Sequence, residues 1–339
     1  MRLAIATLAA AMLAACSQGS DAEIPGPVML QHGSQGTLFV ANKRGASLSR
    51  IDIANGEEMQ RVDTCENPHE LTVSPDESMV MVACYSGNSV QVYAAQDLAP
   101  VSEIELGENA RVHSAIWLDD GSVVAGGEGR GSLFVIDGAG SPRPVVTEIG
   151  GGDPPFAPGA HLITVDDAGE FAWGTIIPTG EVVRYDLGGR EEIARRKVGE
   201  DIEAIALSPD GADLWVSSNS ANMAYRLDPE TLKTRAEIAT GNVPIRLAMR
   251  PSGDFLVSSN FGGGDLSVID TATNEVVRTI SVSDTSDAVQ VTLVFSKDGE
   301  WLYAAETATD TIAEIDFTTG EVLRRIPTGP GGDGLAVVK

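Results

Sequence analysis

Residues 204–240 read AIALSPDGADLWVSSNSANMAYRLDPETLKTRAEIAT. Four short runs of apolar or alternating residues lie within this stretch, at 204–207, 214–216, 223–227 and 233–238. Short runs bounded by Gly, Pro, Asp and Ser are typical of β-strands joined by tight turns. The stretch therefore predicts one antiparallel sheet of four strands, with the first strand the most buried and the fourth the most exposed.

The same pattern returns along the chain at a nearly constant period. An Asp preceded by an apolar residue marks the end of the third run, and this position is occupied by Asp52, Ala94, Asp137, Asp186, Asp228, Asp270 and Asp316. Neighbouring positions are 42 to 49 residues apart. A period in the low forties with β-type patterning throughout is the signature of a β-propeller with one blade per repeat. We predict an all-β fold, a seven-bladed β-propeller of four-stranded antiparallel blades.

The ends of the chain leave one ambiguity in this fold. Strands two to four of the first blade lie within residues 37–63, so its innermost strand must come from elsewhere. Residues 335–338 at the C-terminus can supply it, which would join the ends of the ring and remove a sheet edge. Residues 28–30 are the local alternative, and we favour the C-terminal strand.

The first fifteen residues predict an export signal. Arg2 gives the positive charge, and residues 3–13 form an apolar stretch too short to span a bilayer as a helix. Leu13-Ala14-Ala15-Cys16 then resembles the lipobox of bacterial lipoproteins, which implies cleavage before Cys16 and its acylation. An ordinary secretory signal followed by a chance cysteine is the alternative.

This interpretation divides the chain into a signal peptide (1–15), a lipidated Cys16 with a flexible tether (16–26) and a single propeller domain (27–339). Acyl chains on Cys16 imply a lipid bilayer as partner. Ser17, which is not Asp, favours the outer membrane of a diderm bacterium, with the protein facing the periplasm. In a Gram-positive cell the same signal would give an extracytoplasmic protein.

Several repeat motifs resemble those of the YVTN-repeat, YncE-like propellers. These motifs are LFVAN at 38–42, SPDG at 208–211 and SVIDTATN at 267–274. The resemblance covers about residues 28–339 and implies the seven-bladed fold. It implies no particular activity, because the family includes many proteins of unknown role.

The charge balance bears on partners. The chain has 23 Lys and Arg residues against 49 Asp and Glu, a net charge of −26. Such a surface repels polyanions, and the absence of a basic stripe in the sequence argues against nucleic acid as a partner. Basic partners and cations fit this charge better.

Two cysteines remain after Cys16. Cys65 lies in the loop before an innermost strand and Cys84 at the end of the next strand, positions that share one face of a propeller blade. Export to an oxidising compartment favours a disulfide between them. A thiolate metal site with His69, or two free thiols, are the alternatives.

Three of the four histidines occupy one repeat position. With the innermost strands aligned, this position is filled by His69, His113, His161, Glu203, Ile245, Val291 and Asp333. It lies at the mouth of the central channel, so the side chains are expected to face one axial space. Imidazole and carboxylate groups together suit a transition metal such as Zn or Cu, with His69, His113 and His161 as ligands. A general base beside a substrate, or a purely structural role in the loops, are the alternatives.

Two further features mark the same face. Arg111 and Arg246 lie in the same loops and suit an anionic ligand. The longest insertion, Gly- and Pro-rich residues 150–159, is expected to overhang the face, either as a lid or as a tolerated insertion. The ligand-binding candidates are His69, Arg111, His113, His161, Glu203, Arg246 and Asp333.

Three functions follow from these features. The first, which we favour, is a monomeric, lipid-anchored binding or scaffold protein whose partner is an envelope protein or a small anionic ligand. The second is a metal-binding or redox accessory protein. The third is a metal-assisted enzyme of the lyase or lactonase kind that uses the three histidines. No residue is assigned as catalytic, because no Gly-x-Ser-x-Gly, His-Glu-x-x-His or Cys-x-x-Cys-His motif occurs in the sequence.

Overall fold

The structure is a computed structural model that describes residues 35–152 and 155–339. These residues belong to one compact unit, Gly33–Lys339. The predicted signal peptide, Cys16 and the tether lie outside the described residues. Within the described part of the chain, no helix has both the length and the apolar character needed to cross a bilayer.

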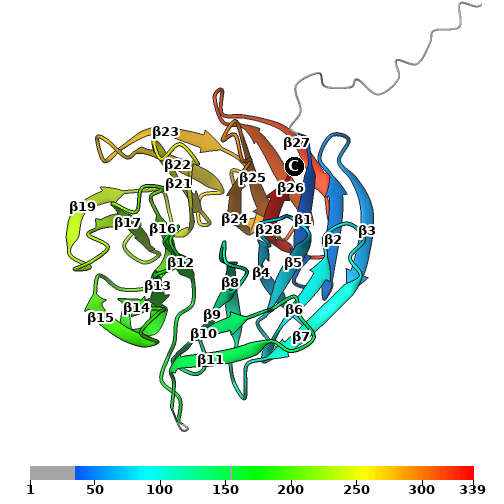
Figure 1. Cartoon of the computed structure of the whole chain (residues 1–339). Helices are drawn as coiled ribbons and strands as arrows, with labels where there is room; N and C mark the ends of the chain where they lie inside the picture. The colour runs from blue at the N-terminus through cyan, green and yellow to red at the C-terminus, as the bar shows by residue number, and fades with distance from the viewer. Residues whose placement is uncertain (1–34, 153–154) are drawn as a thin grey trace, which may run out of the picture. The chain divides into compact units, whose positions relative to one another are not determined.

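Seven antiparallel sheets of four strands form this unit, as predicted, and Figure 1 shows them arranged around a central axis. Blade 1 contains β28 (Gly332–Val338), β1 (Thr37–Asn42), β2 (Ser47–Asp52) and β3 (Glu57–Asp63). Blade 2 contains β4 (Pro68–Val73), β5 (Met79–Cys84), β6 (Ser89–Ala94) and β7 (Pro100–Glu105). Blade 3 contains β8 (Val112–Trp117), β9 (Val123–Gly127), β10 (Ser132–Asp137) and β11 (Val145–Gly150). Blade 4 contains β12 (Ile163–Val165), β13 (Phe171–Ile176), β14 (Glu181–Asp186) and β15 (Glu191–Lys197).

The other three blades repeat this arrangement. Blade 5 contains β16 (Ile202–Leu207), β17 (Leu214–Ser218), β18 (Met223–Leu227) and β19 (Thr234–Ala239). Blade 6 contains β20 (Pro244–Met249), β21 (Phe255–Asn260), β22 (Asp265–Asp270) and β23 (Glu275–Ser281). Blade 7 contains β24 (Gln290–Phe295), β25 (Trp301–Glu306), β26 (Thr311–Asp316) and β27 (Glu321–Pro327). Two short 3₁₀ turns, η1 (Ile177–Thr179) and η2 (Ser286–Ala288), lie in loops between strands.

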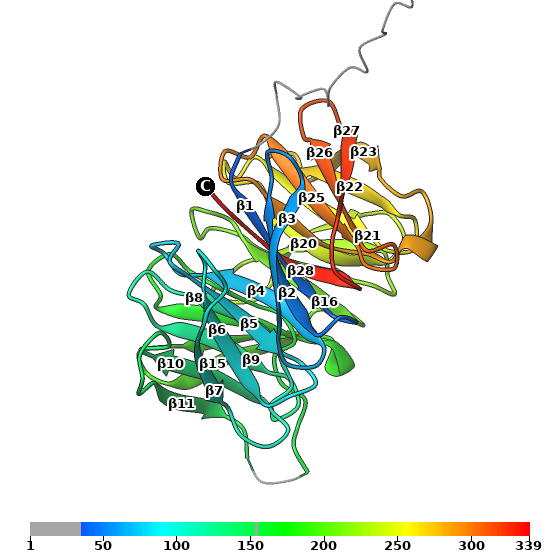
Figure 2. The ribbon, with the colours of Figure 1, turned by 90° about the vertical axis from the view of Figure 1, so that its right-hand side faces the viewer.

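The C-terminal strand closes the ring. β28 pairs antiparallel with β1, in a register that places Thr37 opposite Val338 and Val40 opposite Leu335. Figure 2 shows the two strands lying side by side. The favoured closure is therefore confirmed, and residues 28–30, the local alternative, lie outside the described residues.

The repeated Asp has the structural role that its position suggests. Its carboxylate accepts hydrogen bonds from backbone N–H groups of the turn that follows, as Asp270 does from Ala272 and Thr273, both at 2.9 Å. Asp52, Asp186, Asp228 and Asp316 accept equivalent bonds. Asp137 differs, because its carboxylate lies 3.6 Å from the Arg190 guanidinium of the next blade. This Asp therefore holds the outer hairpin of most blades.

The core is divided among the interfaces between blades. Seven clusters of buried apolar side chains each draw on two neighbouring blades. Trp117, Trp173, Trp215 and Trp301 each belong to or pack against one of these clusters. Because each cluster needs both of its blades, the apolar burial that stabilises the fold is complete only when the ring is closed.

We predict that a chain ending at Gly331, which lacks β28, loses its cooperative fold. Leu335, Ala336 and Val338 are buried against blades 7 and 2, and each large side chain contributes roughly 1.5–3 kcal/mol through burial. The sum is comparable with the whole stability of a typical domain. Urea denaturation followed by tryptophan fluorescence tests this, with removal of Lys339 alone as the control. An unchanged midpoint for the shorter chain would contradict it.

Candidate functional site

A β-bulge at the start of the innermost strands shapes the channel mouth. In six blades the pairing of the innermost strand with its neighbour shifts register at this point. A bulge leaves a residue unpaired and changes the direction of its side chain. In blade 4 the innermost strand begins only at Ile163, so His161 lies in the loop before it. The predicted site residues occupy these irregular positions, where side chains turn towards the channel.

The three predicted histidines lie in one contiguous row. The ring centroids of His69 and His113 are 4.4 Å apart, and those of His113 and His161 are 3.8 Å apart. Tyr85, the residue after β5, extends the row, with its ring 4.5 Å from that of His69. All three histidines are buried. The structure thus brings His69, His113 and His161 together, and we call them the histidine row.

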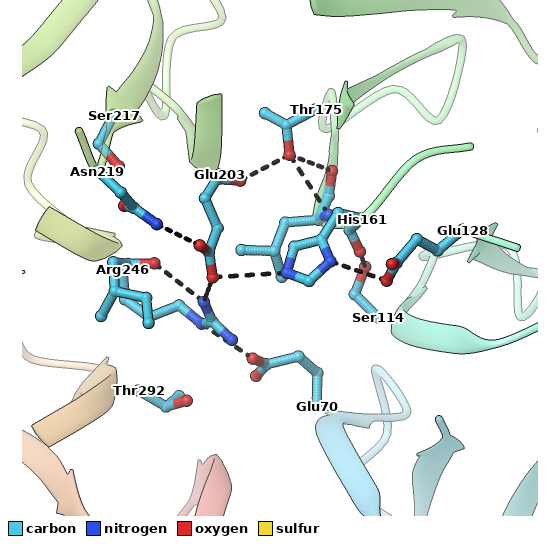
Figure 3. Close-up of polar contacts among 12 residues, drawn as sticks. Glu70, Ser114, Glu128, His161, Thr175, Glu203, Ser217, Asn219, Arg246 and Thr292 are labelled. Atoms are coloured by element: carbon cyan, nitrogen blue, oxygen red, sulfur yellow. Dashed lines mark hydrogen bonds and ion pairs between the residues drawn. The ribbon is translucent and has the colours of Figure 1, made fainter. Parts of the chain in front are cut away.

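His161 lies between two carboxylates, as Figure 3 shows. Its Nδ1 is 2.9 Å from Oε2 of Glu128, and its Nε2 is 3.5 Å from Oε1 of Glu203. Burial disfavours the protonated imidazole, but the two carboxylates outweigh burial and raise the pKa of His161. His161 is therefore the member of the row that carries a proton most readily.

The other two histidines behave in the opposite way. Burial, with help from the charge of Lys43, lowers the pKa of His69 to about 3. Burial also places the pKa of His113 well below its usual value, and His161 adds to this effect. Nδ1 of His113 is buried without a hydrogen-bond partner among the described residues. The row therefore combines two imidazoles whose pKa values are lowered with one whose pKa is raised.

Arg246 links carboxylates from two other blades across the channel mouth (Figure 3). Its Nη1 donates to Oε1 of Glu203 at 2.8 Å, and its Nε donates to Oε1 of Glu70 at 3.2 Å. The amide of Asn219 donates to the other oxygen of Glu203. Although burial alone would raise it, the pKa of Glu203 falls to about 2 through His161 and Arg246. The guanidinium of Arg246 is thus already paired inside the protein.

Asp333, on blade 1 and next to the blade that carries His69, completes the predicted set. Its Oδ2 lies 3.2 Å from Nζ of Lys43, and the hydroxyl of Thr292 donates to its Oδ1 at 3.4 Å. Asp333 is on β28 and Lys43 follows β1, so the strand pair that closes the ring also supplies this ion pair. Ile245 and Val291, the apolar members of the repeat position, pack into the core between blades 7 and 1.

Arg111 lies apart from Arg246, over the ring of Tyr85. Its guanidinium carbon is 4.7 Å from the ring centroid, and Nη2 donates to the Tyr85 hydroxyl. That hydroxyl donates to Oε1 of Glu128 at 3.2 Å. The side chain of Arg111 is 46% exposed, so this arginine faces solvent as well as the site.

A pocket of about 230 Å³ opens beside this group. Arg111, Glu128 and His161 form its polar wall together with Asn109. The apolar wall comes from the insertion and from the loop after β13, through Phe156, Ala157, Pro158, Ile177 and Pro178. Residues 156–159 of the insertion therefore border the candidate site, as expected for an insertion that overhangs this face.

Sequence reasoning missed four polar residues of the site, and they share one position. Lys43, Tyr85, Glu128 and Asn219 each follow directly after the second strand of a blade. Each of them contacts a predicted residue of the mouth. An alignment of the ends of the second strands, like that of the innermost strands, predicts these four residues as part of the site. Glu70 directly follows His69, and successive side chains of a regular strand point to opposite faces. Glu70 was therefore not predicted to share the site with His69.

The histidine row does not have the geometry of a metal centre. Within residues 35–152 and 155–339, no group of three or more His, Cys, Asp or Glu side chains is placed to hold a metal ion. The rings meet through faces and edges, while both nitrogens of His161 are directed to carboxylates. The predicted Zn or Cu site at these histidines therefore finds no support in the structure.

Cys65 and Cys84 form a disulfide, as predicted, with their Cα atoms 5.8 Å apart. The alternative of a thiolate metal site with His69 is therefore wrong. The bond joins the loop before β4 to the end of β5, and Tyr85 is the next residue. It thus anchors the segments that carry His69 and Tyr85, and a disulfide closing a loop of this length stabilises the fold by about 3 kcal/mol.

Comparisons with known proteins agree with the architecture. No protein-family model matches the chain, and no curated protein sequence matches it. Among solved structures, the chain is similar to dihydro-heme d1 dehydrogenase NirN in complex with DHE, with a TM-score of 0.64 and 16% identity over 89% of this chain and 75% of that chain. A likeness at this identity shows the fold alone.

We predict that Arg246→Met destabilises the protein by about 3–5 kcal/mol at pH 7.5, because it leaves Glu70 buried without its ion-pair partner and leaves Glu203 with His161 alone. Without Arg246, burial raises the pKa of Glu70 further above its unfolded-state value. The penalty is therefore absent below the unfolded-state pKa and grows as the pH rises from that value to the raised one. Urea denaturation between pH 5 and pH 8 measures the effect.

The control is the triple variant Arg246→Met, Glu70→Gln, Glu203→Gln. It should regain most of the lost stability and show no gain on acidification from these sites. A triple variant as unstable as Arg246→Met would mean that Arg246 acts through packing rather than charge.

Proposed function

We propose that this protein is a lipid-anchored propeller of the bacterial cell envelope that binds a small molecule in the channel-mouth pocket. The observation that carries the proposal is the pocket of about 230 Å³ with one ionic and one apolar wall. Small-molecule sites are typically concave and apolar, with a few oriented polar groups. Ionisable groups with shifted pKa values, raised for His161 and lowered to about 2 for Glu203, also concentrate at functional sites.

Membership of the YVTN-repeat, YncE-like family is part of this proposal. Its support is that each resembling motif coincides with a defined part of a blade. LFVAN lies in β1, SPDG forms the turn between β16 and β17, and SVIDTATN runs from β22 into the following turn.

The envelope location is also proposed, and it rests on the sequence. The lipobox ending at Cys16 supports acylation, and Ser17 supports the periplasmic face of the outer membrane. The disulfide between Cys65 and Cys84 fits an oxidising compartment.

The metal-dependent alternatives, a redox accessory protein or a lyase- or lactonase-like enzyme, rank behind binding. Their required feature, convergence of His69, His113 and His161 on one ion, is not what the ring geometry supports. The NirN structure is named as a complex with DHE, but a pocket of about 230 Å³ suits a one-ring molecule better than a tetrapyrrole.

For the anchor, we predict that Cys16→Ala abolishes palmitate labelling and moves the protein from the membrane to the soluble fraction, since the acyl chains supply the membrane affinity. Metabolic labelling and fractionation of cells expressing the full chain measure both effects. Ser17→Asp is the matched control, and it should remain acylated while shifting to the inner-membrane fraction. Membrane retention of unlabelled Cys16→Ala would count against the lipoprotein assignment.

For the pocket, we predict that one-ring organic probes of different charge include at least one that binds saturably, and that Ala157→Trp abolishes this binding by filling the pocket. Ligand-observed NMR on the full chain in nanodiscs measures it. Ala212→Trp, at the exposed turn after β16, is the control and should bind like the unmodified protein. Equal binding by both variants, or no binding by any probe, would refute the proposed site.

A further inference from the structure

Arg111 has hydrogen-bonding capacity to spare at the pocket wall. A guanidinium carries five N–H donors. Nη2 of Arg111 contacts Tyr85 and lies 3.7 Å from Oε1 of Glu128, whereas Nε and Nη1 bond no other described residue. Nη1 thus keeps both of its N–H donors, and a charge-assisted hydrogen bond from a guanidinium to a carboxylate is among the strong ones.

The other charged groups of the wall are already paired. Oε1 of Glu128 accepts from the Tyr85 hydroxyl, and Oε2 lies 2.9 Å from Nδ1 of His161. Glu203, deeper in the mouth, is bonded by Asn219 and Arg246. Because these carboxylates are occupied, they offer little to a cationic ligand, and Arg111 is the charge left for an incoming group.

The backbone holds Arg111 in this place at some cost. Asn109 and Arg111 both have left-handed backbone conformations, with φ of 59° and 47°. The same conformation recurs at the equivalent position of other blades, at Asn67, Asp201, Val243 and Val289, so it belongs to the repeat. Gly129, on the facing loop, permits the close approach, since a Cβ atom there would lie 2.3 Å from the Asn109 carbonyl oxygen and 2.9 Å from Cδ of Arg111. The facing loop thus leaves room for the side chain of Arg111.

The apolar wall sets the rest of the ligand. Phe156, Ala157 and Pro158 face the pocket from the insertion, and Ile177 and Pro178 from the loop after β13. An apolar cavity of about 150 Å³ is enough to hold benzene, so a pocket of about 230 Å³ has room for one ring and a carboxylate. The net charge of −26 disfavours ligands that carry several negative charges.

We infer that the pocket takes a monocyclic, singly charged carboxylic acid, with its carboxylate on Nη1 of Arg111 and its ring against the insertion. This inference rests on the proposed small-molecule function and specifies the chemical class of its ligand. Arg111 acts as the specificity-determining residue, while Glu128 and Tyr85 hold its guanidinium in position.

The test compares three probes of nearly equal shape on the full chain in nanodiscs: benzoate, uncharged benzamide and the benzamidinium cation. Ligand-observed NMR titration should give at least tenfold tighter binding of benzoate than of benzamide, and the weakest binding of benzamidinium. Arg111→Gln should weaken benzoate at least tenfold and leave benzamide unchanged. Arg61→Gln, which removes an exposed arginine of β3, should change nothing, and Ala157→Trp should abolish all binding.

The outcomes separate the ligand class from the site. If benzamide or benzamidinium binds as tightly as benzoate and Ala157→Trp still abolishes binding, the pocket functions but the carboxylate inference is wrong. If benzoate binds equally to the unmodified protein and to Arg111→Gln, the role of Arg111 is wrong. If binding survives Ala157→Trp, or if no probe binds, both the inference and the proposed pocket fail.

Discussion

Pairing of β28 with β1 is the constraint on which the channel mouth depends. It closes the sheet ring, and with closure the first residues of the innermost strands face one axis. The same strand pair brings Asp333 to Lys43. Next to Asp333, Gly334 lies so close to blade 2 that a Cβ atom there would be 1.9 Å from the carbonyl oxygen of His69. Closure and the position of the histidine row are therefore set by one strand, and a larger residue at 334 would disturb both.

Within the closed ring, the buried charges are arranged so that each has a partner. Arg246 lies between Glu70 and Glu203, and His161 lies between Glu203 and Glu128. Charges removed from water are costly unless they are paired and hydrogen-bonded, so this network forces carboxylates of different blades into defined positions. The ion group of Arg246 spans the channel mouth, which leaves the solvent-facing pocket at the side of the axis, between blades 3 and 4. The pocket thus lies beside the axis because the ion group of Arg246 occupies the axis itself.

Much of this could be read from the sequence, because the repeat makes equivalent residues occupy equivalent places. The period predicted seven blades and placed His69, His113 and His161 around one axial space, and the missing innermost strand of the first blade favoured the C-terminal closure. It could not predict how the side chains turn, since the bulge at each strand start removes the regular alternation. The imidazoles were expected to share a metal, but they pack against one another. Arg246 was expected to face a ligand, but its guanidinium is hydrogen-bonded to two glutamates. Glu128 was not predicted as a site residue, because the residues that follow the second strands were not compared across the blades.

The state of the polar groups explains why binding is a better interpretation than chemistry. A general base needs a free lone pair near solvent, and a general acid needs a proton directed at the substrate. Both nitrogens of His161 face carboxylates, while burial keeps His113 from gaining a proton. Nε2 of His161 and Nδ1 of His113 form no hydrogen bond with the described residues, but both are buried, whereas Arg111 is half-exposed and keeps unused donors. Ionisable groups that stabilise one another, beside a permanent charge with unused donors, support the proposed binding role.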